Sequence, residues 1–167
     1  MPHVGWFSRT APTAAEVEAK AAQIRAKADR AGVDVLGALA VGHSLVAGTN
    51  LYLVVHPERL DLVSTGQVGG LIGAEAGRES IPLTDVSRVG FRPGLLRCTV
   101  EITWSGGTFD FSADRAIGAL LAETIQSRLE AGPVSDADAT LLRHLADLHA
   151  AGVLTDEEYA AKKAGLL

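Results

Sequence analysis

The run from Leu96 to Trp104 constrains the fold of this chain more than any other segment. Apolar residues occupy every second position in it, and the residues between them are polar or charged. This period of two is that of a β-strand with one buried face. Ser105-Gly106-Gly107 then predicts a tight turn, and Thr108 to Phe111 predicts a returning strand. The side chains expected to point inward are Leu96, Cys98, Val100, Ile102, Trp104, Phe109 and Phe111.

Other segments favour further strands and a helix that covers them. Residues 51–56 and 59–64 are β-rich runs separated by a Pro-Glu turn signal, and residues 81–91 continue the pattern with an interruption at Asp85. Residues 35–46 predict one or two strands. After the hairpin, a helix capped by Ser112 or Asp114 and ended by Gly132 is expected to cover the sheet. Its apolar stripe consists of Ile117, Leu120, Leu121, Ile125 and Leu129.

The first 32 residues predict a separate helix with two open arrangements. Thr13 and Glu16 have the spacing of a capping box. The helix can pack on the next domain through a narrow stripe of small residues. Alternatively, this basic region can lie on a membrane surface as a peripheral anchor. The stripe is Val17, Ala21, Ile24 and Ala28, and the expected membrane contacts are Trp6, Phe7, Lys20 and Lys27.

The last 37 residues predict a small helical hairpin. Ser135 with Asp138, and Thr155 with Glu158, mark the starts of two helices. A unit of roughly 30 residues is too small to bury a sufficient core alone. The hairpin must therefore dock on its own domain, on a partner, or on another copy.

Composition excludes several classes of protein. Among 167 residues, 15 are basic and 20 acidic, and only 5% are aromatic, so nucleic-acid binding is not expected. The single cysteine, Cys98, excludes an internal disulfide, and its place on the apolar face of a strand predicts a buried, inert thiol. The start of the sequence lacks a signal-peptide pattern, and no apolar run is long enough to span a bilayer. We therefore expect a cytoplasmic location, with peripheral membrane contact as the alternative.

Local motifs do not indicate catalysis, a metal or a cofactor. The stretch from Gly42 to Val46 lacks the second glycine of a nucleophile elbow. The glycine-rich residues 66–77 lack Gly-Lys-Ser/Thr and predict a loop between strands. His144 and His149 project from different faces of a helix. An enzyme with an unrecognised polar pocket stays open as a further hypothesis.

The C-terminus carries a specific order of residues. A leucine-rich helix leads to the turn Gly152 to Thr155, three acidic residues and Tyr159, and a lysine pair precedes the final Leu166-Leu167. This order resembles the short C-terminal domain family known as SHOCT. The resemblance implies a non-catalytic module, appended to other domains, that mediates oligomerisation or partner contact.

The middle of the chain carries a second, more diffuse pattern. Leu53 to Leu60 and Ile81 to Val89 precede the hairpin and the closing helix in an order that resembles bacterial pleckstrin-homology-like (PH-like) domains. The resemblance implies a seven-stranded, bent sheet with a C-terminal helix over one open end. In lipid-binding relatives the loop between the first two strands is basic. Gly42 to Asn50, the corresponding residues here, contain no Lys or Arg.

Together these patterns predict an α+β chain in three parts. They are an N-terminal segment and helix (1–32), a PH-like bent sheet or barrel with its closing helix (33–130), and a helical hairpin (131–167). We expect a non-catalytic scaffold that self-associates or binds a protein through the hairpin. The expected contact residues are Leu141, Leu145, Leu148, Val153, Leu154, Tyr159 and Leu166.

Overall fold

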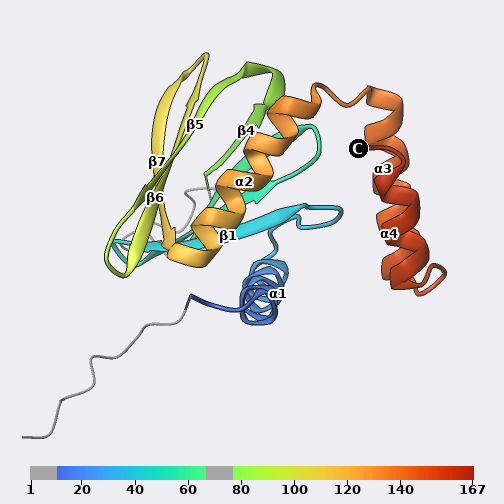
Figure 1. Ribbon diagram of the computed structural model, residues 1–167, viewed down its shortest axis with the longest axis horizontal. Helices are drawn as coiled ribbons and strands as arrows, with labels where there is room; N and C mark the ends of the chain where they lie inside the picture. Colours follow the sequence, from blue (N-terminus) through green and yellow to red (C-terminus); the bar gives the residue numbers. More distant parts are fainter. Residues whose placement is uncertain (1–10, 67–76) are drawn as a thin grey trace, which may run out of the picture.

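A computed structural model describes residues 11–66 and 77–167, which form two antiparallel sheets and four α-helices (Figure 1). The predicted mixture of helices and strands is therefore confirmed. The elements are α1 (Ala14–Arg30), β1 (Ala40–Val46), β2 (Thr49–Val55), β3 (Arg59–Thr65), β4 (Arg78–Pro82), β5 (Val86–Pro93), β6 (Arg97–Trp104), β7 (Gly107–Asp114), α2 (Arg115–Ala131), α3 (Asp136–Ala150) and α4 (Asp156–Ala164). A single 3₁₀ turn, Leu83–Asp85, stands where the strand pattern breaks.

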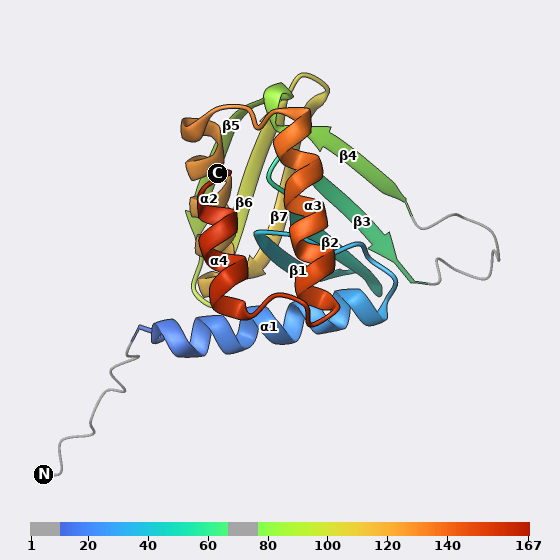
Figure 2. The same ribbon diagram turned by 90° about the vertical axis from the view of Figure 1, so that its right-hand side faces the viewer.

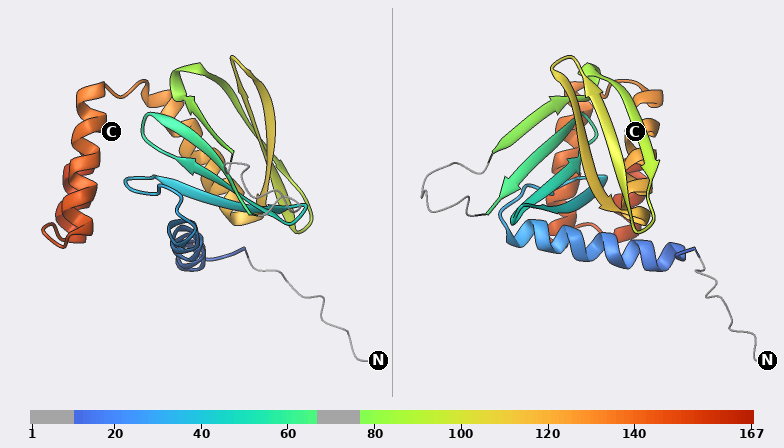
Figure 3. Two further views of the ribbon diagram at one scale, coloured as in Figure 1. Left: turned by 180° about the vertical axis from the view of Figure 1, so that it is seen from behind. Right: turned by 90° about the vertical axis from the view of Figure 1, so that its left-hand side faces the viewer.

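The two sheets are open meanders that lie face to face (Figure 3). One has the order β1-β2-β3-β4 and the other β5-β6-β7. Within the described residues neither sheet closes on itself, so the structure does not have the closed barrel that was one of the two predicted forms. The Leu96–Trp104 hairpin is confirmed as β6 and β7, with Val100 opposite Phe111.

Helix α2 packs against both sheets and fills the space between them. Asp114 caps it by accepting a hydrogen bond from the Ala116 N–H at 3.1 Å. Gly118 faces Cys98 so closely that a Cβ atom at position 118 would overlap the Cys98 Sγ. Burial raises the pKa of the Cys98 thiol, in keeping with the predicted unreactive cysteine. The main core is made by Leu53, Leu60, Val100, Ile102, Phe111, Ile117, Leu121 and Ile125.

Helix α1 lies against β1 and the foot of α2 (Figure 2). The Thr13–Glu16 capping box is present, and Ala28 is fully buried. Arg25 donates hydrogen bonds to the carbonyls of Val35 and Ala38, at 3.3 and 2.6 Å. The structure thus shows the first of the two predicted arrangements, in which this helix packs on the next domain.

Two local predictions are wrong. The stretch from Gly42 to Asn50 is not a loop: β1 continues to Val46, β2 begins at Thr49, and only Ala47-Gly48 make the turn. Leu96 does not point inward, because β6 begins one residue later and leaves Leu96 66% exposed in the β5–β6 turn. The prediction of one or two strands within residues 35–46 is confirmed with one strand, β1, and residues 35–39 before it are irregular.

Candidate functional site

The C-terminal hairpin has two apolar rows on α3 that face in different directions. Leu142, Leu145 and Ala146 are buried. Ala146 faces the loop before β1, where a Cβ added to Gly37 would lie 3.6 Å from the Ala146 Cβ. Helix α4 has no fully buried residue. The buried row of α3 thus includes one contact with the domain, at Gly37.

The second row is open to solvent. Leu141, seven residues before Leu148, is 46% exposed, Leu148 is 42% exposed, and Val153 in the turn is 65% exposed. Residues seven apart lie on the same face of a helix. Among the other predicted contact residues, Leu145 belongs to the buried row, and Leu154, Tyr159 and Leu166 are half-buried. The predicted set therefore combined two rows with different roles.

Aromatic stacking joins the two helices of the hairpin. The His149 ring stacks on Tyr159 with 4.5 Å between ring centroids and 8° between the planes. Its Nε2 lies 2.6 Å from the Asp156 carboxylate, and Lys163 Nζ lies 5.6 Å from the Tyr159 centroid. Sequence reasoning had left His149 without a role. The positions of His149 and Tyr159 on either side of the turn were the signal that could have indicated this stacking contact.

Arg128 on α2 ties the end of the hairpin to the domain. Its buried guanidinium donates to three backbone oxygens: Pro57 at 3.3 Å, Gly132 at 3.1 Å and Leu167 at 3.3 Å. Burial lowers the pKa of this arginine. A second, exposed contact joins Arg143 of α3 to Glu58, at 3.5 Å.

Replacing Arg128 with methionine should loosen the hairpin. The change keeps the length of the side chain but leaves three carbonyl groups without their donor, so the free energy of unfolding should fall by about 1–3 kcal/mol. Amide hydrogen exchange should accelerate across residues 136–164 while the core strands stay protected. Arg143→Met is the matched control and should cost about 0–1 kcal/mol, because its single contact is exposed. Equal effects of the two variants would contradict the anchoring role of Arg128.

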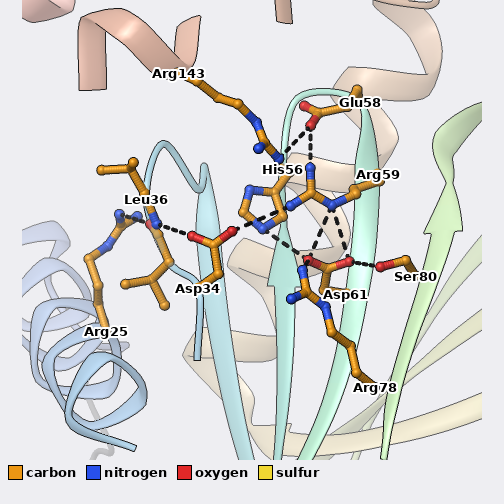
Figure 4. A network of polar contacts seen from close by, with 11 residues as sticks. Arg25, Asp34, Leu36, His56, Glu58, Arg59, Asp61, Arg78, Ser80 and Arg143 are labelled. Atoms are coloured by element: carbon orange, nitrogen blue, oxygen red, sulfur yellow. Dashed lines mark hydrogen bonds and ion pairs between the residues drawn. The ribbon is translucent and has the colours of Figure 1, made fainter. Parts of the chain in front are cut away.

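The densest group of charged side chains surrounds Asp61, at the β2–β3 end of the domain (Figure 4). The Asp61 carboxylate is 1% exposed. It accepts hydrogen bonds from Arg59 Nε at 3.2 Å, from Arg78 at 2.7 Å and from the Ser80 hydroxyl. His56 Nε2 lies 3.3 Å from it, in a direction unsuited to a hydrogen bond. Arg59 also contacts Glu58, and so connects Asp61 to Arg143 of the hairpin.

The network holds a buried carboxylate in its charged form. Burial opposes the charged form of Asp61, but the contacts with His56, Ser80, Arg59 and Arg78 outweigh it and hold its pKa well below the usual range. Glu58 of this network lines a cleft of about 480 Å³ between the described residues, and Asp61 and His56 do not. Across residues 11–66 and 77–167, no three His, Cys, Asp or Glu side chains are grouped as metal ligands.

The basic residues predicted to touch a membrane are directed to the domain. Lys20 forms an ion pair with Asp114 at 2.7 Å. Lys27 Nζ lies 3.1 Å from His43 Nε2 and 3.4 Å from Asn50 Oδ1. Trp6 and Phe7 lie outside the described residues. In the part of the chain that is described, the helices lack the length and apolar character that crossing a bilayer requires.

Comparison with known proteins identifies one segment. Residues 140–167 match the model of the short C-terminal domain family, SHOCT. This match confirms the predicted resemblance, and it covers most of α3, the turn and α4. No curated protein matches the chain. The SHOCT segment thus contains both rows of α3, the buried one and the exposed one.

Proposed function

We propose that this chain is a non-catalytic, cytoplasmic scaffold that pairs with a second copy of itself through the exposed row of its SHOCT segment. The two sheets and α2 would form a PH-like platform, and the hairpin would supply the contact. The single observation that carries the proposal is the position of Leu141, Leu148 and Val153, which are open to solvent on a hairpin docked through its other row.

A second copy suits this surface for a physical reason. Clustered apolar side chains on one face of a surface helix mark an interaction site. A two-fold contact lets the same row meet itself, so that every apolar side chain gains an equivalent partner. The peripheral-membrane alternative stays a prediction, and the contacts of Lys20 and Lys27 with the domain do not favour it.

Light scattering after size exclusion, over a wide range of protein concentration, tests this proposal. The full chain should form a dimer as concentration rises. Leu141→Glu combined with Leu148→Glu should weaken dimerisation at least about a hundredfold, since each buried leucine contributes about 1.5–3 kcal/mol. Both positions are exposed in the monomer, so the variant should keep its thermal stability.

The control places the same charges on leucines outside the hairpin. Leu95 and Leu96 are exposed in the β5–β6 turn, and changing both to glutamate should leave the dimer intact. A full chain that stays monomeric at every concentration, or a control that dissociates as readily as the hairpin variant, would overturn the proposal.

A further inference from the structure

The turn between β5 and β6 carries two leucines that the turn itself does not require. Leu95 and Leu96 are its central residues, and the Gly94 N–H donates a hydrogen bond to the Arg97 carbonyl at 2.8 Å across it. Such central positions usually hold Gly, Asn, Asp or Pro. Leu95 is 86% exposed, more than any other large apolar side chain in the described residues, and Leu96 follows it. Adjacent exposed leucines indicate a contact outside the chain.

A second apolar turn lies at the same end of the domain. Leu45 and Val46, at the end of β1, are also exposed. The Arg97 side chain donates a hydrogen bond to the Ser44 hydroxyl at 3.3 Å and so joins the two turns. Both turns lie at the left-hand end of the sheets in Figure 1 and at the right-hand end in the left panel of Figure 3. Four exposed apolar side chains therefore gather at one end of the molecule.

Two arginines next to these turns lack an acidic partner. Arg97 donates to the Ser44 and Ser112 hydroxyls and to the Ser112 carbonyl, which are all uncharged. Arg115 is exposed and follows the residue that lies opposite Arg97 in the sheet. Among residues 11–66 and 77–167, neither arginine forms an ion pair. Both guanidinium groups can therefore bind phosphate, which suits their fork of N–H donors.

The acidic side chains of β6 and β7 are engaged by other cations. Glu101 and Asp110 contact Arg92, at 3.5 and 2.8 Å. Asp114 contacts Lys20 at 2.7 Å. The net charge of −5 is spread over the whole chain, and salt screens charges beyond about 8–10 Å. The nearby arginines, rather than the net charge, therefore decide what this end can bind.

A bilayer fits this end better than a folded partner does. A turn tip is convex, and two leucines offer far less surface than the roughly 800 Å² per partner that a stable protein interface buries. Lipids can rearrange around a convex tip. An anionic bilayer supplies an apolar interior for the leucines and phosphate groups for the arginines.

We propose that the β5–β6 turn inserts Leu95 and Leu96 into an anionic phospholipid bilayer, while Arg97 and Arg115 bind the lipid phosphates. The exposed end of β1 rests on the same surface. These contacts differ from the membrane contacts predicted from the sequence, which lie on α1 and before it. The SHOCT hairpin lies on the opposite side of the molecule in Figure 1, so the proposal does not depend on the dimer.

Flotation of the full chain with vesicles tests the proposal. The chain should float with mixed phosphatidylcholine–phosphatidylglycerol vesicles, and binding should fall at least about tenfold with phosphatidylcholine alone. Leu95→Glu combined with Leu96→Glu, the variant expected to keep its dimer, should bind the mixed vesicles at least about a hundredfold more weakly. Its thermal stability should not change, since both positions are exposed. The matched control, Thr84→Glu with Ser87→Glu, adds the same charges at the other end of β5 and should bind as the wild-type chain does.

A fluorophore attached to Leu95→Cys gives a second readout, because the native Cys98 is buried. Its emission should move to shorter wavelength when mixed vesicles are added. The same label on Thr84→Cys should not respond, because that position is exposed at the far end of β5.

A full chain that does not float, or equal losses in the two double variants, would overturn the proposal. So would flotation that the Leu95–Leu96 variant retains, since another surface would then hold the chain on the vesicle. An emission shift at position 95 that grows with protein concentration in the absence of vesicles would also overturn it, because a second protein molecule would then cover the turn.

Discussion

Replacing Asp61 with alanine should lower the free energy of unfolding by about 3–5 kcal/mol, because it removes the buried anion on which the half-buried Arg59 and its polar neighbours converge. Asp61 is 1% exposed and holds Arg59, Arg78 and Ser80 in place. Urea denaturation at neutral pH measures the loss. The matched control is Asp147→Ala, at an exposed position of α3, which should change stability by less than about 0.5 kcal/mol.

The same carboxylate should make stability depend on pH. Its pKa is depressed in the folded state, so its contribution is complete above the unfolded value of about 3.9 and is lost as pH falls toward the folded value. Asp61→Asn removes this titration. The stability gap between the wild-type chain and Asp61→Asn should therefore narrow from pH 7 to pH 3. A gap that stays constant would show that folding does not lower the pKa of Asp61.

Changing Gly118 to alanine should destabilise the chain by about 1–3 kcal/mol, although alanine is the better helix former. The reason is local: the new Cβ would overlap Cys98 Sγ. The same change in a Cys98→Ala background should be neutral or stabilising by up to about 1 kcal/mol, because the Cβ atoms would then lie 3.6 Å apart.

Thermal unfolding of the four chains in this double-mutant cycle measures the coupling. The cycle contains its own control, since Cys98→Ala alone reports the loss of the thiol. If Gly118→Ala changed stability equally in the wild-type and Cys98→Ala backgrounds, the Cys98 sulfur would not limit how closely α2 approaches the sheet.

Local patterns were enough to predict most elements of the fold. The capping boxes at Thr13 and Thr155, the cap at Asp114 and the alternation along β6 all depend on neighbours within a few residues. The turn between β1 and β2 was misplaced because apolar residues on both faces of β1 hide the end of the strand. How the two sheets face each other depends on distant contacts that leave no periodic signal.

The candidate site was only partly predictable for a similar reason. Helical spacing places the apolar residues Leu141, Leu145 and Leu148 near one face of a helix. It does not show which of them is buried and which is exposed. That choice depends on the loop around Gly37 and on Arg128, which donates to Pro57, 71 residues away in the sequence. The Asp61 network also escaped notice, since its members lie on β3, on β4 and in the turn between β2 and β3.

The order of strands also affects how the chain reaches its fold. In the described part of the chain, every paired strand lies next to its partner in sequence. Closing such hairpins costs less chain entropy than bringing distant strands together, and proteins rich in local contacts fold faster. We therefore expect each meander to form early, and α2, which follows both in the chain, to join them last. We expect the docking of that helix, rather than the pairing of any strand, to be the slow step of folding.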